Sequence, residues 1–383
     1  MPLRIRSLSD LAAISAGSHV LCLYSGGLDG TYLLSSLGEL RGVRVTALTV
    51  SLGSGESLGR IRRATDFFGM ESIIVDRTVE FAERYVASAI HSQAVYLGAH
   101  PISASLSRPL IAQTACEVAA ALGYGVILHT SNRSQNSLRR FNSSLASLGF
   151  AGLFGSPFEL SGLSREAKIE ALRRLGLEQG EDRSYSTDVN LWCREIEYGP
   201  LDDPESIDLA SAPFVWTSSG AHADSISVVL RFTGGRPTHL DGRPIHLVPL
   251  IRFLNEAVGS RGLGRYVGLE EIQDGFKVQE LREMPAAHIL LDAYRRLESA
   301  CVPAEVIRVK MNMEQLWVRE AVEGRWFGPL RVAAQAFNSS VANAVSGDVT
   351  YVLGPGEMSL RALRADKPLY VRDRIAFEEQ MPR

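Results

Sequence analysis

The sequence predicts an α/β protein in which a doubly wound parallel sheet comes first and an α+β domain follows. Residues 1–180 alternate short apolar runs with segments of helical spacing, which is typical of strand–helix units on a parallel sheet. After about Asp182, turn sequences such as Thr233–Pro237 and Asp241-Gly242 indicate antiparallel strands joined by hairpins instead. A Gly-rich turn directly after the first strong apolar run adds a candidate ligand site to the parallel sheet.

The first part of the chain contains alternating predicted strands and helices. The predicted strands, which share an apolar and β-branched character, are His19–Ser25, Val43–Val50, Ile73–Val75 and Gly125–Thr130. The predicted helices, which carry apolar residues at helical spacing, are Thr31–Leu40, Ser57–Phe68, Glu80–His91 and Pro109–Leu122. Open sheets of this kind bind ligands beyond the carboxyl ends of their strands, so we expect the site there.

The second part mixes strands and longer helices. Its predicted strands are Val215–Ser218, Ser225–Phe232, Pro237–Leu247, Asp348–Leu353 and Met358–Leu363. Its predicted helices are Val248–Val258, Ala286–Ser299 and Ala304–Glu323. We expect a nucleotide-binding domain over 1–180, a substrate-binding and oligomerisation domain over 181–365 and a short tail over 366–383.

Composition excludes several classes of protein. The 383 residues carry 40 Lys and Arg against 43 Asp and Glu, scattered along the chain, so no nucleic-acid partner is expected. The 4 Cys are dispersed without a C-x-x-C spacing, which argues against zinc-ribbon and thioredoxin-type sites, and no metal site is predicted from the residues. No apolar run reaches the roughly 18 residues of a membrane helix, and no export signal is evident. We therefore expect a soluble cytoplasmic protein that binds no membrane.

The Gly-rich turn joins the first strand to a helix and reads Ser25-Gly26-Gly27-Leu28-Asp29-Gly30-Thr31. Glycines let the backbone approach a ligand closely, and the free N–H groups and dipole of a helix start favour a bound phosphate. The segment is neither a Walker A loop nor a dinucleotide fingerprint. On these residues alone, a phosphate loop and an ordinary tight turn remain equal alternatives.

The pattern S-G-G-x-D after the first strand resembles the pyrophosphate loop of the N-type ATP pyrophosphatases, which belong to the adenine nucleotide alpha hydrolase-like fold. Those enzymes cleave ATP between the α and β phosphates to adenylate a substrate. The tRNA thiolases of this group need cysteines that this chain does not offer, and the glutamine-dependent synthetases need an amidotransferase domain that is not evident here.

Further segments resemble the argininosuccinate synthase family over nearly the whole chain. Ser105-Leu-Ser-Arg108-Pro109-Leu-Ile-Ala112 is similar to the family's S-L-A-R-P-L-I-A, and Tyr185-Ser186-Thr-Asp188-Val-Asn190-Leu-Trp192 to its Y-S-x-D-E-N-L-W. Gly262–Arg265, Glu270, Gly275–Lys277, Glu283–Pro285 and Gly324–Pro329 follow in the family's order and spacing. The chain is therefore identified as resembling this family.

The resemblance implies ATP and Mg²⁺ as cofactors and small amino-acid-like substrates. In the family, ATP adenylates the ureido oxygen of citrulline with release of pyrophosphate, and the amine of aspartate then displaces AMP. A ureido group is a poor electrophile, and the adenylate supplies a leaving group next to an oriented amine. By resemblance, Ser25, Asp29 and Thr31 are the catalytic residues. The residues implied to bind ATP are Ser25, Gly26, Gly27, Leu28, Asp29, Gly30, Thr31, Ala47 and His129.

The substrate residues depart from the family pattern. The family segment H-G-x-T-G-K-G-N-D-Q-V-R-F-E corresponds to His129–Asn142, where Asn132 and Ser137 replace a Thr and an Asp that hold aspartate. Ala104 replaces a further Thr. On the citrulline side a Tyr becomes His100, a Ser becomes Glu195 and another Tyr becomes Arg282. The expected substrate residues, retained or exchanged, are His100, Ser105, Asn132, Asn136, Ser137, Arg140, Ser186, Glu195, Glu270 and Arg282.

These exchanges support the interpretation that the adenylating half is intact and the acceptor is retargeted, in a specialised pathway such as natural-product biosynthesis. Arg selects carboxylate or phosphate and Glu selects amines, so the new charges redefine a ligand. A purely structural alternative is that Glu195 and Arg282 pair with each other and compensate each other's charge. Two further alternatives are a genuine argininosuccinate synthase and a non-catalytic nucleotide or amino-acid sensor. A homo-oligomer, dimer or tetramer, is expected, and the short tail after Val371 puts the tetramer in doubt.

Overall fold

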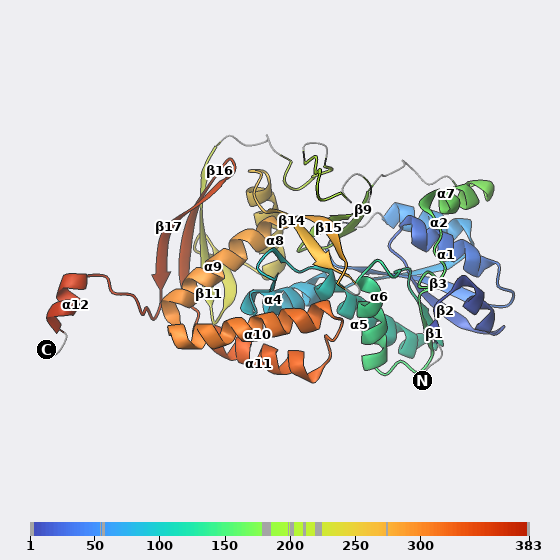
Figure 1. The fold of residues 1–383 in the computed structure, drawn as a ribbon, viewed down its shortest axis with the longest axis horizontal. Coiled ribbons are helices and arrows are strands. Elements are labelled where there is room, and N and C mark those ends of the chain that lie inside the picture. Colours follow the sequence, from blue (N-terminus) through green and yellow to red (C-terminus); the bar gives the residue numbers. More distant parts are fainter. Residues whose placement is uncertain are drawn as a thin grey trace.

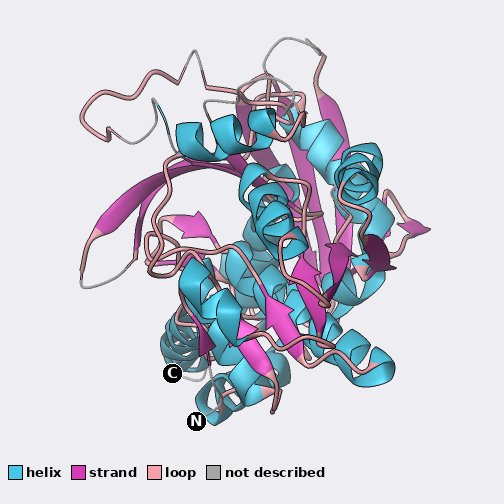
Figure 2. Ribbon diagram, turned by 90° about the vertical axis from the view of Figure 1, so that its right-hand side faces the viewer, coloured by secondary structure: helices cyan, strands magenta, loops and turns pink. Residues whose placement is uncertain are grey.

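A computed structural model describes residues 4–53, 55, 58–177, 185–197, 199, 203–209, 212–218, 224–272 and 275–380. The parallel sheet and its helices occupy one end of the molecule, and two antiparallel sheets with long helices occupy the other (Figure 1). Helices and strands interleave throughout the body of the protein (Figure 2). The expected α/β class is confirmed. The predicted domain boundary at 180/181 lies outside the described residues.

The first sheet has six strands, all paired in parallel. Across the sheet they are β1 (Arg4–Ile5), β8 (Leu153–Gly155), β7 (Val126–Leu128), β2 (His19–Leu23), β3 (Arg44–Ser51) and β4 (Glu71–Asp76). The chain winds outward from β2 to β4 and then returns to β7 on the other side of β2. The carboxyl ends of β2 and β7 therefore form the switch point at which an open sheet binds its ligand.

Both faces of this sheet are buried, as its near-continuous apolar strands require. Val20 and Cys22 of β2 join one core cluster, whereas Leu21 and Leu23 join the cluster on the opposite face. The covering helices are α1 (Leu28–Gly38), α2 (Leu58–Phe67), α5 (Ala104–Leu122), α6 (Ser137–Ser147) and α7 (Arg165–Arg174). A 3₁₀ helix, Leu8–Ala13, lies between β1 and β2.

The segment after β4 packs with the second part of the chain. It runs through α3 (Thr78–Glu80), a π-helical stretch (Phe81–Val86), α4 (Ala87–His91) and the short pair β5 (Val95–Tyr96) and β6 (His100–Pro101). Phe81, Ile90 and Leu106 are buried in the same cluster as Trp192, Tyr294 and Trp317. This core cluster therefore joins residues that are far apart in the sequence, from Leu52 to Leu353.

Two antiparallel sheets build the second part. One contains β14 (Arg265–Glu271), β15 (Lys277–Glu283), β10 (Arg194–Glu197) and β9 (Ser186–Val189) in that order. The other contains β13 (Arg243–Pro244), β12 (Arg236–Leu240), β11 (Ile226–Thr233), β16 (Gly347–Gly354) and β17 (Glu357–Ala365). The helices are α8 (Leu247–Gly259), α9 (Pro285–Cys301), α10 (Ala304–Val322) and α11 (Pro329–Ala342). Helix α12 (Arg374–Gln380) stands away from this body (Figure 1).

Two expected strands differ in the structure. Val215–Ser218 is a bend and turn, because its backbone N–H groups at Val215 and Thr217 donate to the Glu283 carboxylate and not to a strand. The expected strand over 237–247 splits at Asp241, whose φ of 49° makes a turn, and α8 already begins at Leu247. The sequence analysis did not anticipate α11 or strands β9, β10, β14 and β15. None of the described helices is long and apolar enough to cross a bilayer.

Candidate active site

The Gly-rich turn after β2 has the geometry of an anion-binding loop. Gly26 adopts a φ of 81°, which side-chain-bearing residues rarely adopt. A Cβ on Gly30 would lie 2.6 Å from the Tyr24 ring, so the helix packs closely on the strand end. Gly27 is the N-cap of α1 and provides no side-chain cap, which leaves the first N–H groups of the helix free for a ligand.

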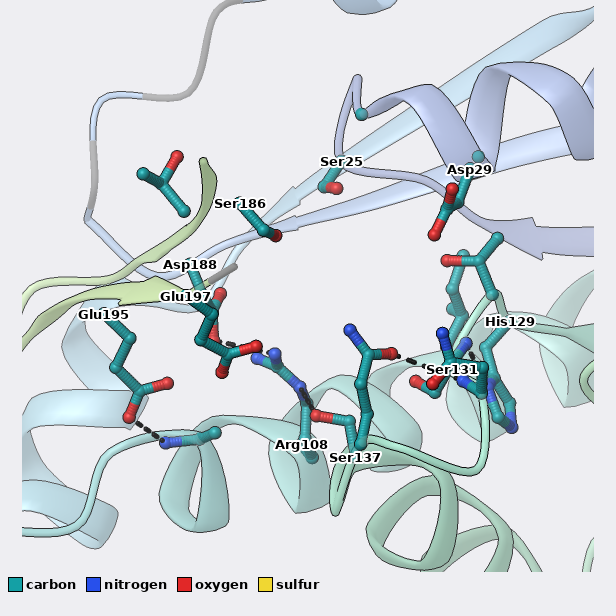
Figure 3. Close-up of a pocket in the computed structure, with 18 of the residues that line it drawn as sticks. Ser25, Asp29, Arg108, His129, Ser131, Ser137, Ser186, Asp188, Glu195 and Glu197 are labelled. Carbon is teal, nitrogen blue, oxygen red and sulfur yellow. Dashed lines mark hydrogen bonds and ion pairs between the residues drawn. The ribbon is translucent and has the colours of Figure 1, made fainter. Parts of the chain in front are cut away.

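This loop forms one wall of a cavity of about 790 Å³. Further walls come from the segment after β7 and from β9 and β10 (Figure 3). The β14–β15 face also lines the cavity. A volume of this size suits a nucleotide together with small substrates. The cavity therefore opens at the predicted switch point and extends from there into the second part of the chain.

Most of the sequence-predicted site residues line this cavity. They are Ser25, Gly27, Leu28, Asp29, Gly30, His129, Asn132, Asn136, Ser137, Arg140, Ser186, Glu195 and Glu270. The remaining ones are described but lie behind its walls: Gly26, Thr31, Ala47, His100, Ser105 and Arg282. Thr31, for example, shares a hydrogen bond of 2.9 Å with the Tyr24 hydroxyl and donates to Gly27 O, so its hydroxyl braces the loop. Functional roles for all of these residues stay predictions.

The segment after β7 positions the predicted aspartate-side residues. His129 is buried, and its Nδ1 accepts from Ser131 N while its Nε2 lies 3.2 Å from Asn142 Oδ1. Burial lowers the pKa of His129 to about 4, so the ring is neutral at neutral pH. Asn136 donates to Glu271 O, and Ser137 accepts from Arg108 Nε at 3.1 Å. Arg108 also pairs with Asp188 at 2.7 Å and links this segment to β9.

The far end of the cavity is a buried network of charged groups on the β14–β15–β10 sheet. Arg140 NH2 lies 2.6 Å from Glu270 Oε1, so these two expected substrate residues are paired with each other. Arg282 stands directly opposite Glu195 in the strand register, with Nε 3.4 Å from Glu195 Oε1. Arg282 also contacts Glu270 and Glu280. The alternative in which Glu195 and Arg282 pair with each other is therefore what the structure contains.

Carboxylates dominate the cavity side of this network. Glu195, Glu197, Glu270 and Glu280 line the cavity, whereas Arg282 lies behind them. Burial raises the pKa of Glu280 and of Glu195 despite the opposing effect of Arg282, and neighbouring carboxylates raise both further. Burial opposes the ionisation of Glu270 too, but Arg140 and Arg282 hold its pKa below the usual range. Burial raises the pKa of Glu197 to about 7, and neighbouring carboxylates add to the shift.

His100 lies behind the same network. Its ring is 1% exposed, and neither of its nitrogens has a hydrogen-bond partner among the described residues. Burial lowers its pKa to about 3, and Arg282 lowers it further, so the ring adds no positive charge. The close approach of this ring to β14 needs Gly268, where a Cβ would lie 2.5 Å from His100 Nδ1. His100 therefore packs behind the cavity wall and does not line the cavity.

Sequence reasoning missed several cavity residues. Glu197 and Glu280 could have been found from strand alternation, because they lie two positions from Glu195 and Arg282 on the same faces. Lys168 gave no local signal. It reaches the cavity from α7, and its Nζ lies 2.8 Å from Asp29 Oδ1 in the phosphate loop.

The residues of the loop fit Mg²⁺ carried by a nucleotide better than a resident ion. Mg²⁺ is commonly held by one or two carboxylates together with substrate phosphates. Asp29 is the carboxylate that the first turn of α1 offers to this cavity, and its side chain is 36% exposed. In the described part of the chain, His, Cys, Asp and Glu form no cluster that could hold a metal alone.

Comparisons with known proteins agree along the whole chain. Residues 19–178 match the family described as Arginosuccinate synthase N-terminal HUP domain, and residues 185–382 match the Arginosuccinate synthase C-terminal domain. The chain is 34% identical to argininosuccinate synthase of Pyrococcus furiosus over 363 residues, which are 94% of this chain and 88% of the relative. It is 35% identical to that of Pyrobaculum aerophilum over 89% of this chain and 87% of the relative.

Solved structures match only in part. NMN synthetase from Francisella tularensis is similar over 44% of this chain and 66% of its own, with 17% identity and a TM-score of 0.32. NH3-dependent NAD synthetase from Campylobacter jejuni gives 17% identity and a TM-score of 0.29 over 44% of this chain and 69% of its own.

Proposed function

The chain belongs to the argininosuccinate synthase family of ATP-dependent, AMP-forming carbon–nitrogen ligases, and from this premise we propose that it adenylates citrulline and joins it to aspartate. The bond formed links the ureido carbon to the amine nitrogen, and the products are argininosuccinate, AMP and pyrophosphate. The observation that carries the proposal is a single cavity that connects the phosphate loop to Asn136, Arg140 and Glu270.

In the proposed reaction, the loop binds the triphosphate. The free N–H groups at the start of α1 neutralise the phosphates, and Asp29 holds Mg²⁺ with them. Mg²⁺, when bound, stabilises the negative charge on the departing pyrophosphate. Ser25 faces the cavity from the turn itself, where its hydroxyl donates to a phosphate oxygen. The roles of ATP and of these residues follow from the family and the cavity together.

The acceptor end binds the amino-acid head group of citrulline. Arg140 and Glu270 already form a pair of 2.6 Å, and a zwitterion is held when its carboxylate faces the cation and its ammonium faces the anion. Asn136 and Ser137 line the cavity beside this pair, where they approach the second amino acid. Two hydrogen bonds fix the orientation of the neutral His129 ring, and through them the ring holds the segment after β7 in place.

The family relationship supports citrulline and aspartate over the specialised substrates that the exchanged residues suggested. At the same time, one observation favours a second candidate with the same chemistry and another ureido substrate. Arg282 lies behind the cavity wall, where its guanidinium is engaged by Glu195, Glu270 and Glu280, so it does not line the cavity to receive a substrate carboxylate. The excess of carboxylates at this wall favours a substrate with an ammonium group and no carboxylate.

The two candidates differ in one assay. The purified protein is given ATP and Mg²⁺ with citrulline, or with a ureido alkylamine that lacks the carboxylate, and release of pyrophosphate is measured with and without aspartate. Faster release of pyrophosphate with citrulline and aspartate than with the ureido alkylamine supports the main proposal. A preference for the ureido alkylamine overturns it in favour of the second candidate, and nucleotide binding without turnover of any ureido compound supports the sensor alternative.

A homo-oligomer and a cytoplasmic location complete the proposal. Both are consistent with the family relationship. Size-exclusion chromatography with light scattering measures the oligomeric state directly, and a monomer at micromolar concentration would contradict this part of the proposal.

A further inference from the structure

Lys168 is a buried lysine with few partners at the edge of the phosphate loop. It lies in the first half of α7, whose N-cap Ser164 accepts from Ala167 N. Only 8% of the residue is exposed, although it lines the cavity. Its Nζ lies 2.8 Å from Asp29 Oδ1 and 5.0 Å from the centre of the Phe158 ring. A contact with one carboxylate and a ring face leaves part of its donor capacity unused, because an ammonium has three N–H groups.

The charge of Asp29 explains why a cation is needed there. Asp29 lies in the first turn of α1, where the helix dipole and the free N–H groups attract anions. A carboxylate at this place repels a phosphate unless a cation stands between or beside them. Lys168 neutralises Asp29 from outside the loop, and its ammonium lies within reach of the same space.

Two other cations that line the cavity, Arg108 and Arg140, are already engaged. Arg108 is bound to Asp188 and Ser137, and Arg140 is bound to Glu270 and the Val322 carbonyl.

We propose that Lys168 is a phosphate-binding residue that contacts the β- and γ-phosphates of ATP and the pyrophosphate that leaves. The inference rests on the proposed use of ATP and is independent of the acceptor. A purely structural role, in which Lys168 only ties α7 to α1 through Asp29, predicts equal effects on all nucleotides. A phosphate-binding role predicts effects only on ligands that carry the β- and γ-phosphates.

Titration calorimetry of the whole protein with ATP, AMP and pyrophosphate tests this difference. We expect Lys168→Met to weaken ATP and pyrophosphate about 10- to 100-fold, the usual range for a lost charge-assisted hydrogen bond, with AMP changed less than about threefold. The matched control is Arg174→Met on the same helix, whose side chain is 76% exposed. Thermal unfolding shows whether each variant is folded. Equal weakening of ATP and AMP, or no weakening, would overturn the proposal.

A double variant separates direct contact from simple neutralisation of Asp29. ATP binding is compared for Lys168→Met, Asp29→Asn and both together, in EDTA so that a metal on Asp29 does not contribute. If Lys168 contacts phosphate, the double variant binds ATP more weakly than Asp29→Asn, because the contact is lost even when the carboxylate is absent. Recovery to the level of Asp29→Asn would show that Lys168 only cancels the carboxylate, and would overturn the inference. A wild-type protein that binds no ATP at all would instead refute the proposed function.

Discussion

Replacement of Arg282 by Met tests the buried charge network most directly. The substitution keeps an unbranched apolar stem but removes the guanidinium, which leaves Glu195, Glu270 and Glu280 without their shared cation. Because the Arg282 side chain is 3% exposed, water cannot replace it. Breaking a buried pair of this kind costs about 3–5 kcal/mol. For a domain of this size the loss corresponds to a drop in Tm of roughly 6–20 °C.

The matched control is Arg231→Met. Arg231 also bridges two carboxylates, Asp348 and Asp366, but its side chain is 32% exposed. A surface pair contributes about 1 kcal/mol or less, so we expect a fall in Tm of no more than about 4 °C. Both variants are compared by thermal and urea unfolding at the same pH. Equal losses for Arg282→Met and Arg231→Met would refute the conclusion that the network is buried and coupled.

The pH dependence of Arg282→Met gives a second measure. Burial already raises the pKa of Glu195 and Glu280, and loss of the guanidinium removes the main effect that opposes this rise. A group whose folded pKa is raised contributes stability that is complete below the unfolded pKa and is lost as the pH rises through the folded pKa. The variant should therefore lose more stability relative to wild type at pH 8 than at pH 5. The triple replacement Glu195→Ser, Glu280→Gly and Arg282→Tyr removes the charges together and should recover most of the loss.

Three further predictions concern single positions in the cavity. Burial raises the pKa of Glu197 to about 7, so the stability that this group contributes is complete below a pH of about 4.3, the unfolded pKa, and is lost as the pH rises through 7. Glu197→Gln should therefore flatten the fall in Tm between pH 5 and 8, and an unchanged fall would contradict this. Gly26→Ala forces a side chain into a φ of 81°, so it should lower the free energy of unfolding in urea by about 1 kcal/mol and weaken ATP binding in calorimetry. Unchanged values of both would be inconsistent with the loop geometry. Ser137→Asp places a carboxylate beside Arg108 and should lower the KM for aspartate about tenfold in the pyrophosphate-release assay, whereas a higher KM would argue against aspartate at this position.

Local sequence signals predicted the nucleotide half of the protein well. Strands with apolar residues on both faces, such as Val20–Leu23, can only be buried between helices, and this identified the parallel sheet. The Ser25–Thr31 segment is predicted as a turn from its glycines, and its phosphate-binding role is predicted from the resemblance of S-G-G-x-D to a family loop. The structure gives Gly26 a φ of 81° and a helix start without a side-chain cap. The strand predicted over Val215–Ser218 is wrong for the opposite reason, since the backbone N–H groups of this segment donate to Glu283, sixty-six to sixty-eight residues away.

The sequence by itself determined the fold class, the place of the Gly-rich turn and the family resemblance, because each depends on residues that are close together or on a pattern of types along the chain. The tertiary structure alone decided which of those residues face the cavity. It places Thr31, His100 and Arg282 behind the cavity walls, and it places Lys168 beside Asp29, from which it is 139 positions away in the sequence. The pairing of Glu195 with Arg282 depends on strand register, which a chain acquires only when distant segments bury their faces together.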